Sequence, residues 1–249
     1  MKIIISPAKK MNINTDIFGH TDLPVFLSRT KELMNYMKSL SFTEAKKLWG
    51  CNDKIAVQNF ERYGTMDLER QLTPAIISYE GIQYQYMSPM VFSEECLDYV
   101  QKHLRILSGF YGILKPFDGV TPYRLEMQAK ASVGSFKDLY EYWGDSLYQE
   151  LTSDGDHVIL NLASKEYSKC IEKYVGKDNL FVSCIFGELV DNKVVQKGTL
   201  AKMARGEMVR YLAENQVNTL DGVKEFCRLG YEFSEGLSSK KEYLFIKTT

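Results

Sequence analysis

The features that would place this chain in a well-defined class are largely missing from its sequence. Its five cysteines are widely spaced, odd in number and form no C-x-x-C pair, which favours free thiols in a reducing cytoplasm over a disulfide scaffold. Its three histidines show no metal-ligand spacing with these cysteines, so we expect no metal site. No apolar run approaches the ~18 residues that cross a membrane, and the N-terminal run of three isoleucines is too short for a signal peptide. We therefore expect a cytoplasmic protein without membrane contact.

Signatures of known catalytic and cofactor-binding sites are also missing. The sequence holds no G-x-S-x-G, no P-loop and no dinucleotide-binding fingerprint, so we expect no cofactor. No cysteine has both an adjacent base and a resolving partner, which a peroxidatic thiol would need. Glu126 is the candidate acid or base, and a salt bridge to Arg124 or Arg105 is the alternative role of its carboxylate. The sequence does not decide whether the protein is an enzyme.

The residues that are present indicate one globular domain. The 249 residues are 45% hydrophobic and 25% charged, and no repeat, low-complexity segment or linker divides them. Strand patterns scattered among helical ones predict a single α/β domain (α+β mixed) over residues 1–249, with a mixed sheet surrounded by helices. The net charge of −1 means that any nucleic-acid binding must come from a local patch. We expect a monomer.

Apolar patterns and capping residues predict where the elements lie. A buried strand over residues 2–5 ends at Ser6, and the loop from there to Lys9 lies where open α/β sheets place ligand contacts, although polar loops without function are common. Further strands are expected at 74–79, 158–162 and 180–186. A turn at 191–192 would let residues 194–195 pair with the last of these strands. Helices are expected at 135–151, from an N-cap at Ser164 onward, and at 199–215.

The stretch of residues 105–118 contains two glycines three residues apart, after a helical pattern that begins at Ser93. An apolar-x-Gly-x-x-Gly-apolar turn after a helix resembles the hairpin of helix-hairpin-helix DNA-binding motifs. Gly109 and Gly112 allow a close backbone approach to a partner, and free amides at the start of a second helix would suit a phosphate oxygen. Two glycines at this spacing also occur in ordinary tight connections, and Pro116 would break a second helix.

Two segments are locally basic despite the neutral total. Residues 101–130 carry five Lys or Arg against two acidic residues, and residues 193–210 carry five against one. If both segments line one groove, they would neutralise several phosphates with strongly salt-dependent affinity, whereas most basic stretches form a solvated face. Phe110, Tyr111 and Tyr123 are placed among these charges and would stack on unpaired bases.

Seven short motifs follow one another along the chain. They are Ile5-Ser-Pro-Ala-Lys9; Arg105-x-Leu-Ser-Gly-Phe-Tyr-Gly-Ile-Leu-Lys-Pro-Phe-Asp118; Pro122-Tyr-Arg-Leu-Glu-Met127; Lys137-x-Leu-Tyr-x-Tyr-Trp-Gly144; Asn161-Leu-Ala-Ser-x-Glu-Tyr167; Ala201-Lys-x-Ala-Arg-Gly206; and Gly230-Tyr-x-Phe233. In this ordered set the chain resembles the bacterial peroxide stress protein YaaA family, essentially from end to end.

This resemblance implies a cytoplasmic protein of the hydrogen peroxide response that limits iron-driven damage to DNA and protein. It also implies an α/β fold with a positively charged cleft, DNA binding, and a helix-hairpin-helix element that falls on Leu107 to Gly112. It implies no established catalytic residue. The polar positions shared with the family's motifs are Ser6, Lys9, Arg105, Tyr123, Arg124, Glu126, Asn161, Ser164, Tyr167, Lys202 and Arg205.

Two functions follow as hypotheses. The first is binding of double- or single-stranded DNA, with hairpin amides and basic side chains on phosphates and a tyrosine on bases or sugars. The second is an enzyme that acts on a small phosphorylated or nucleotide-like ligand, with Glu126 as acid or base. A closed pocket too small for a duplex would favour this second hypothesis. Direct iron sequestration is disfavoured for lack of ligand spacing. The residues expected to bind DNA or phosphate are Ser6, Lys9, Arg105, Gly109, Tyr111, Gly112, Tyr123, Arg124, Asn161, Ser164, Tyr167, Lys202 and Arg205.

Overall fold

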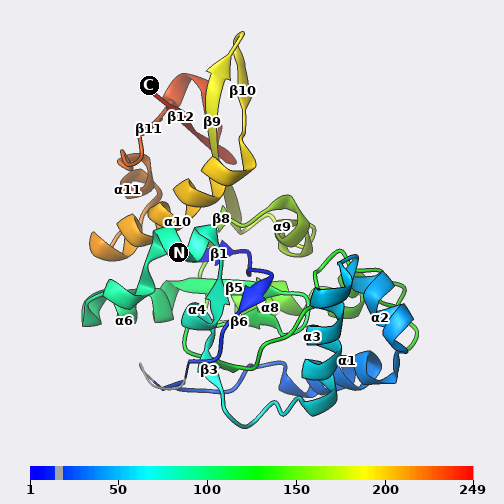
Figure 1. Cartoon of the computed structure of the whole chain (residues 1–249). Helices are drawn as coiled ribbons and strands as arrows, with labels where there is room; N and C mark the ends of the chain where they lie inside the picture. The colour runs from blue at the N-terminus through cyan, green and yellow to red at the C-terminus, as the bar shows by residue number, and fades with distance from the viewer. Residues whose placement is uncertain (15–18, 249) are drawn as a thin grey trace.

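A mixed sheet of eight strands forms the central layer of the computed structural model, which describes residues 1–14 and 19–248 (Figure 1). The strand order is β11-β12-β9-β8-β1-β5-β6, and β10 pairs with the far half of β9. The strands are β1 (Lys2–Ile5), β5 (Leu104–Ser108), β6 (Gly112–Leu114), β8 (Val158–Leu162), β9 (Leu180–Val190), β10 (Lys193–Val195), β11 (Tyr231–Phe233) and β12 (Glu242–Lys247). This confirms the α/β class predicted from the sequence.

The first strand lies in the middle of this sheet. β1 pairs in parallel with β5 on one side and with β8 on the other, and all four of its residues are buried. A strand covered on both faces favours a continuous apolar run, which explains the three consecutive isoleucines. Because β1 and β8 run in the same direction, the loops that follow them leave from the same edge of the sheet.

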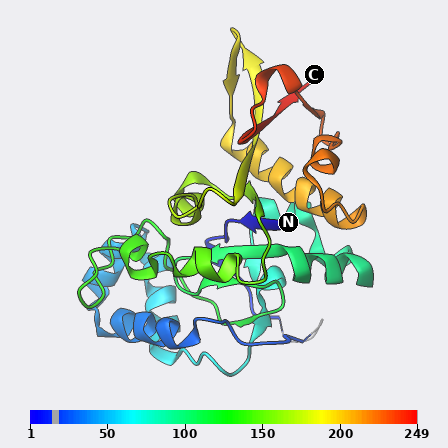
Figure 2. The same cartoon turned by 180° about the vertical axis from the view of Figure 1, so that it is seen from behind.

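Helices cover the sheet and extend beyond both of its ends. Figures 1 and 2 show α1 to α3 gathered at one end of the molecule, with α10 and α11 at the opposite end beside the C-terminal strands. None of the described helices is long and apolar enough to cross a membrane. The helices are α1 (Leu27–Ser39), α2 (Phe42–Trp49), α3 (Asp53–Thr65), α4 (Ala75–Ser78), α5 (Ile82–Met87), α6 (Glu94–His103), α7 (Leu139–Trp143), α8 (Ser146–Leu151), α9 (Lys165–Glu172), α10 (Gly198–Glu214) and α11 (Leu220–Lys224).

Two predicted elements differ from the structure. Residues 74–79 were expected as a strand, but they form the single turn of α4 between β3 (Thr73–Pro74) and β4 (Tyr79–Glu80). A short apolar run does not distinguish a buried helix from a strand, so packing decides. The helix expected over 135–151 is two helices, α7 and α8, because Gly144 has a φ of 54° and ends the first.

The helix-hairpin-helix element expected at Leu107 to Gly112 is not confirmed, because this segment is a β-hairpin. Strands β5 and β6 are antiparallel, with Ser108 opposite Gly112, and every residue from 104 to 114 is buried. A Cβ at Gly109 would lie 2.5 Å from the Leu125 carbonyl oxygen, and one at Gly112 would lie 2.8 Å from Trp143 and Leu147. These glycines serve internal packing, and the amides of the turn do not face solvent.

The buried carboxyl of Asp118, just beyond this hairpin, gives a first testable prediction. Asp118 is 3% exposed, its Oδ2 accepts from the Lys115 amide at 2.8 Å, and burial raises its pKa to about 7. The folded state therefore binds this proton more tightly than the unfolded state, so the stability contributed by Asp118 falls as pH rises through 7. Between pH 5 and pH 8 the free energy of unfolding of the wild type should fall by about 2 kcal/mol relative to that of Asp118→Asn.

Urea denaturation of both proteins at the two pH values measures this difference. Other acidic groups titrate equally in both proteins, so the comparison isolates Asp118. An identical gap between wild type and variant at pH 5 and pH 8 would contradict the assignment.

Candidate functional site

A pocket of about 430 Å³ opens where the loops after β1 and β8 meet helices α5, α9 and α10. We call it the β1–α9 pocket. It collects side chains from five separate stretches of the sequence. The residues that line it are Ser6, Pro7, Ala8, Lys9, Lys10, Glu80, Gly81, Ile82, Gln83, Tyr84, Tyr123, Arg124, Leu125, Glu126, Ser164, Glu166, Tyr167, Lys202 and Arg205.

Two serines join the loops at the base of the pocket. The Ser6 hydroxyl accepts a hydrogen bond from the Ser164 amide at 2.8 Å and lies 3.2 Å from the Ser164 hydroxyl. Ser164 occupies the N-cap position of α9, as predicted, but its side chain makes no capping hydrogen bond to that helix. The first turn of α9 therefore has no side-chain cap, and its N-terminal amides and partial positive charge favour an anion at this end.

Close packing of α10 on α5 brings two cations to the wall of the pocket. A Cβ at Gly206 would lie 2.1 Å from the carbonyl oxygen of Gln83, so only glycine lets the two helices approach this closely. Lys202 and Arg205 are on the preceding turn of α10 and line the pocket, as does Gln83 on α5. The α10–α5 contact thus sets the position of both cations.

Ion pairs occupy some of the charged groups in the pocket. The Glu126 carboxylate contacts Lys9 Nζ at 2.9 Å and Arg124 Nη2 at 3.2 Å, so the salt bridge to Arg124 suggested by the sequence is present. Lys10 is paired with Glu80 at 2.7 Å. In contrast, Lys202 and Arg205 form no ion pair with any described residue.

Three buried nitrogen donors in the pocket lack a hydrogen-bond partner within the described part of the chain. They are Gln83 Nε2, Arg124 Nε and Arg205 Nε. Partial desolvation also lowers the pKa of the Arg205 guanidinium, and no described residue forms an ion pair with it. Because buried polar groups are nearly always hydrogen-bonded, three unpaired donors in one pocket indicate a site for an acceptor-rich ligand.

Tyrosines form the aromatic side of the pocket. The Tyr123 hydroxyl lies 2.7 Å from Ser108 Oγ and 2.8 Å from the Tyr79 hydroxyl, and Tyr84 donates to the Ser6 carbonyl at 3.0 Å. Burial raises the pKa of Tyr123 to about 12, so its phenol stays neutral. Hydrogen bonds at the hydroxyls of Tyr84 and Tyr123 fix these two rings, which line the pocket with apolar surface.

Nine of the residues predicted from the sequence meet in this pocket, namely Ser6, Lys9, Tyr123, Arg124, Glu126, Ser164, Tyr167, Lys202 and Arg205. Five others lie outside it. Arg105 is buried and donates to the carbonyl oxygens of Gln101 and Leu104 at 3.1 and 2.7 Å, where it neutralises the end of α6. Tyr111, with Gly109 and Gly112, lies inside the β5–β6 hairpin region, and its hydroxyl accepts from the Thr121 amide at 3.0 Å.

Asn161 does not line the pocket, but it holds a residue that does. Its Oδ1 accepts from the Ala163 amide at 2.9 Å, and its Nδ2 donates to Ser183 Oγ at 3.0 Å. These bonds fix the turn that presents Ser164. Sequence reasoning missed Glu80, Gln83, Tyr84 and Glu166, which also line the pocket; Glu166 is inside the Asn161–Tyr167 motif, which was the available signal.

Comparisons with known proteins agree with this arrangement of motifs. The family model described as "Peroxide stress protein YaaA" matches residues 1–237. A UPF0246 protein of Lachnoclostridium phytofermentans is 57% identical over 247 residues, which is 99% of this chain and 96% of that protein. UPF0246 proteins of Agathobacter rectalis and Desulfitobacterium hafniense are 57% and 55% identical over 98% and 99% of this chain, and over 98% of each relative. The chain therefore belongs to the peroxide stress protein YaaA family.

Proposed function

We propose that this peroxide stress protein acts in the cytoplasm by binding a phosphorylated, nucleotide-like ligand in the β1–α9 pocket. The observation that carries the proposal is the set of buried donors at Gln83, Arg124 and Arg205, which have no partner among the described residues and line the same pocket as Lys202. A phosphate group supplies several strong acceptors and two negative charges, which this wall lacks. The volume of about 430 Å³ suits a ligand of nucleotide size and is within the range of small-molecule sites.

The lining of the pocket fits both parts of such a ligand. Lys202, Arg205 and the uncapped first turn of α9 would hold the phosphate, as helix N-termini and cations do in other phosphate sites. Tyr84 and Tyr123 would contact the base or sugar. Calorimetric titration with nucleoside mono-, di- and triphosphates, and with the unphosphorylated nucleoside, tests the proposal. Equal affinity for nucleoside and nucleotide would reject it.

A catalytic role for Glu126 stays a prediction. Its carboxylate is held between Lys9 and Arg124, which keeps it close to the pocket. Incubation with the nucleotides that bind, followed by chromatography of the products, separates an enzyme from a binding protein. Turnover that disappears in Glu126→Gln, with binding retained, would assign Glu126 as the acid or base.

We propose DNA as a second ligand of this pocket, bound through an unpaired nucleotide or a strand end. The supporting observation is the cationic side of the pocket, where Lys9 is 65% exposed and Lys202 is exposed and forms no ion pair with a described residue. Exposed salt bridges such as Lys9–Glu126 contribute little, so Lys9 is free to exchange its partner for a phosphate. Entry of an intact duplex is not part of this proposal, because the pocket has the size of one nucleotide.

Fluorescence anisotropy with single-stranded and duplex DNA at rising salt tests DNA binding. Each lysine that neutralises one phosphate of a single strand should contribute ~0.7 to the slope of log K against log salt. We therefore expect Lys9→Gln with Lys202→Gln to reduce the slope by about 1.4 for single-stranded DNA. No binding at low salt, or a slope that the double variant does not change, would contradict this second role.

The pH dependence of binding should depend on Glu166. Burial raises the pKa of this carboxyl, and the neighbouring Glu126 raises it further. Protonation at lower pH removes a negative charge from the pocket, so affinity for a phosphodiester ligand should rise several-fold as pH falls from 7 to 5. Glu166→Gln should bind more tightly at pH 7 and show a flatter pH profile. A phosphodiester is used because a phosphate monoester titrates near pH 6 itself.

A further inference from the structure

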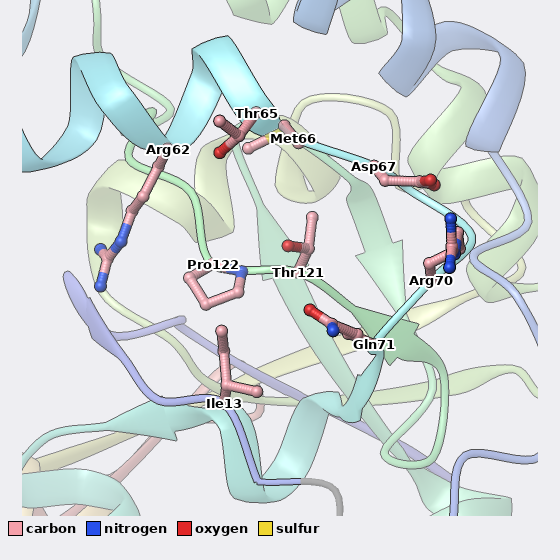
Figure 3. Close-up of a pocket in the computed structure, with 9 residues that line it drawn as sticks. All are labelled: Ile13, Arg62, Thr65, Met66, Asp67, Arg70, Gln71, Thr121 and Pro122. Carbon is pink, nitrogen blue, oxygen red and sulfur yellow. The ribbon is translucent and has the colours of Figure 1, made fainter.

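A second pocket lies beside the first, at the last turn of α3 (Figure 3). We call it the α3 pocket. Its volume is about 420 Å³, and its walls are the end of α3, the loop that follows to Gln71, and Thr121–Pro122. Figure 3 shows Arg62 and Arg70 on opposite sides of the cavity, with Pro122 between them. None of these residues contributes to the β1–α9 pocket.

The cations of the α3 pocket lack strong partners. The Arg62 guanidinium makes one long hydrogen bond, to Asn59 Oδ1 at 3.4 Å, and partial burial lowers its pKa. Arg70 forms no hydrogen bond or ion pair with a described residue. The acidic group in the lining, Asp67, accepts from the Glu69 amide at 2.9 Å, which occupies one of its oxygens within the loop. The positive charges of Arg62 and Arg70 are therefore not neutralised by any described residue of the α3 pocket.

The loop that carries Arg70 is held in an uncommon conformation. Gln71 has a φ of 53°, a left-handed value that a residue with a side chain adopts at a cost of about 1 kcal/mol or more. The adjoining residues are fixed by the fold, because Leu72 and Thr73 are buried and Thr73 pairs with Val120. A strained residue held on the wall of a cavity is typical of a ligand-binding segment, where the surrounding structure maintains the strain.

Two segments of the chain connect the α3 pocket to the β1–α9 pocket. Pro122 lines the first and Tyr123, the next residue, lines the second. Likewise Ile13 lines the first and Lys10, three residues earlier, lines the second. Because an extended chain advances at most ~3.6 Å per residue, these lining residues are within about 11 Å of each other. One ligand longer than a single nucleotide would span this distance.

We infer that the α3 pocket is a second anion-binding subsite for the ligand of the β1–α9 pocket, and that this ligand carries two phosphate groups separated by a nucleoside. The inference rests on the proposed function, because it assumes that the first phosphate is held beside Lys202 and Arg205. Arg62 and Arg70 hold the second phosphate from either side of the α3 pocket. Ile13, which is 61% exposed, and Pro122 give it an apolar floor.

Calorimetric titration at fixed salt tests the second subsite with two probes. Thymidine 5′-monophosphate carries one phosphate, and 5′-phosphorylated dithymidylate carries two with a nucleoside between them. Wild type should bind the dinucleotide about 30-fold more tightly, the gain expected from one additional phosphate on charged donors. Arg62→Gln with Arg70→Gln should reduce this preference to about 3-fold, with the affinity for the monophosphate unchanged. Lys47→Gln with Lys54→Gln removes two exposed charges from α2 and α3 outside the pocket, and should keep the preference.

The outcomes separate the two proposals. Failure of wild type to bind either probe rejects the proposed function and the subsite with it. Binding of both probes with the same preference in wild type and in the arginine variant rejects the second subsite alone. If the arginine and lysine double variants lose the preference for the dinucleotide equally, the second subsite is also rejected. That result would mean that net charge, and not a specific site at Arg62 and Arg70, causes the preference.

Discussion

Replacing Arg205 by methionine should weaken binding of the phosphorylated ligand by roughly 100-fold, the effect of losing about 3 kcal/mol of charged hydrogen bonds to phosphate. The same change should leave the fold as stable as wild type, or more stable. The Arg205 side chain is half-buried with its Nε atom fully buried, and no described residue forms an ion pair that would offset the cost of keeping its charge from water. Methionine has a similar length and flexibility and no charge to desolvate. Binding and stability are therefore expected to change in opposite directions.

The matched control is Arg210→Met, five residues further along the same helix, α10. Arg210 is one-third exposed and is paired with Glu214, outside the β1–α9 pocket. This variant should change neither ligand affinity nor stability by more than about 0.5 kcal/mol. Calorimetry gives the affinities and urea denaturation gives the stabilities. A loss of stability in Arg205→Met as large as its loss of binding would assign Arg205 to the fold, and the anion site would lose its principal residue.

Gly206→Ala should cause the largest loss of stability among single-methyl substitutions in this chain, about 3 kcal/mol or more. The added Cβ would lie 2.1 Å from the Gln83 carbonyl oxygen and 3.0 Å from the Met87 amide nitrogen. Both atoms are backbone, so no side chain rotates to make room, and α10 must move away from α5. That movement would also separate Arg205 from Gln83 and reduce ligand affinity.

Gly198→Ala is the control for this prediction, because it adds the same methyl to the same helix where nothing lies within 4 Å. It should be neutral or stabilising by a few tenths of a kcal/mol, as alanine favours a helix over glycine. Urea denaturation of both variants, with nucleotide titration of each, measures the difference. If Gly206→Ala were as stable as Gly198→Ala, the close contact between α10 and α5 would be wrong, and with it the account of how the pocket is assembled.

Local chemistry explains the elements that were predicted correctly. Ser93 caps α6, the helix predicted to begin there, and the side chains of Ser41 and Asn52 likewise cap α2 and α3. Asp191 and Asn192 both have positive φ in the turn between β9 and β10, as expected for this residue pair in a two-residue hairpin. Each of these structures involves residues within four positions of each other, so the sequence alone contains the information.

The interpretation of Gly109 and Gly112 failed for the opposite reason. Their spacing matched a DNA-binding hairpin, but the atoms that require a glycine belong to Leu125, Trp143 and Leu147, more than ten residues away along the chain. The helix that begins after Ser93 was expected to run into these glycines, but it ends at His103, and from Leu104 the chain is a strand that pairs with β1. Pairing with a strand a hundred residues earlier is a tertiary effect that no local pattern contains.

By itself, the sequence determined the central buried strand, the loops that follow β1 and β8, and most of the polar side chains that meet there. Parallel strands bring their carboxyl ends to one edge, so Ser6 and Ser164 were placed together by topology alone. Only the tertiary structure decided which cations face that edge. Arg105 is turned inward to the end of α6, whereas Arg205 enters the pocket because Gly206 lets α10 pack on α5. The direction of a long charged side chain depends on the surfaces packed around its backbone, and those surfaces come from distant parts of the chain.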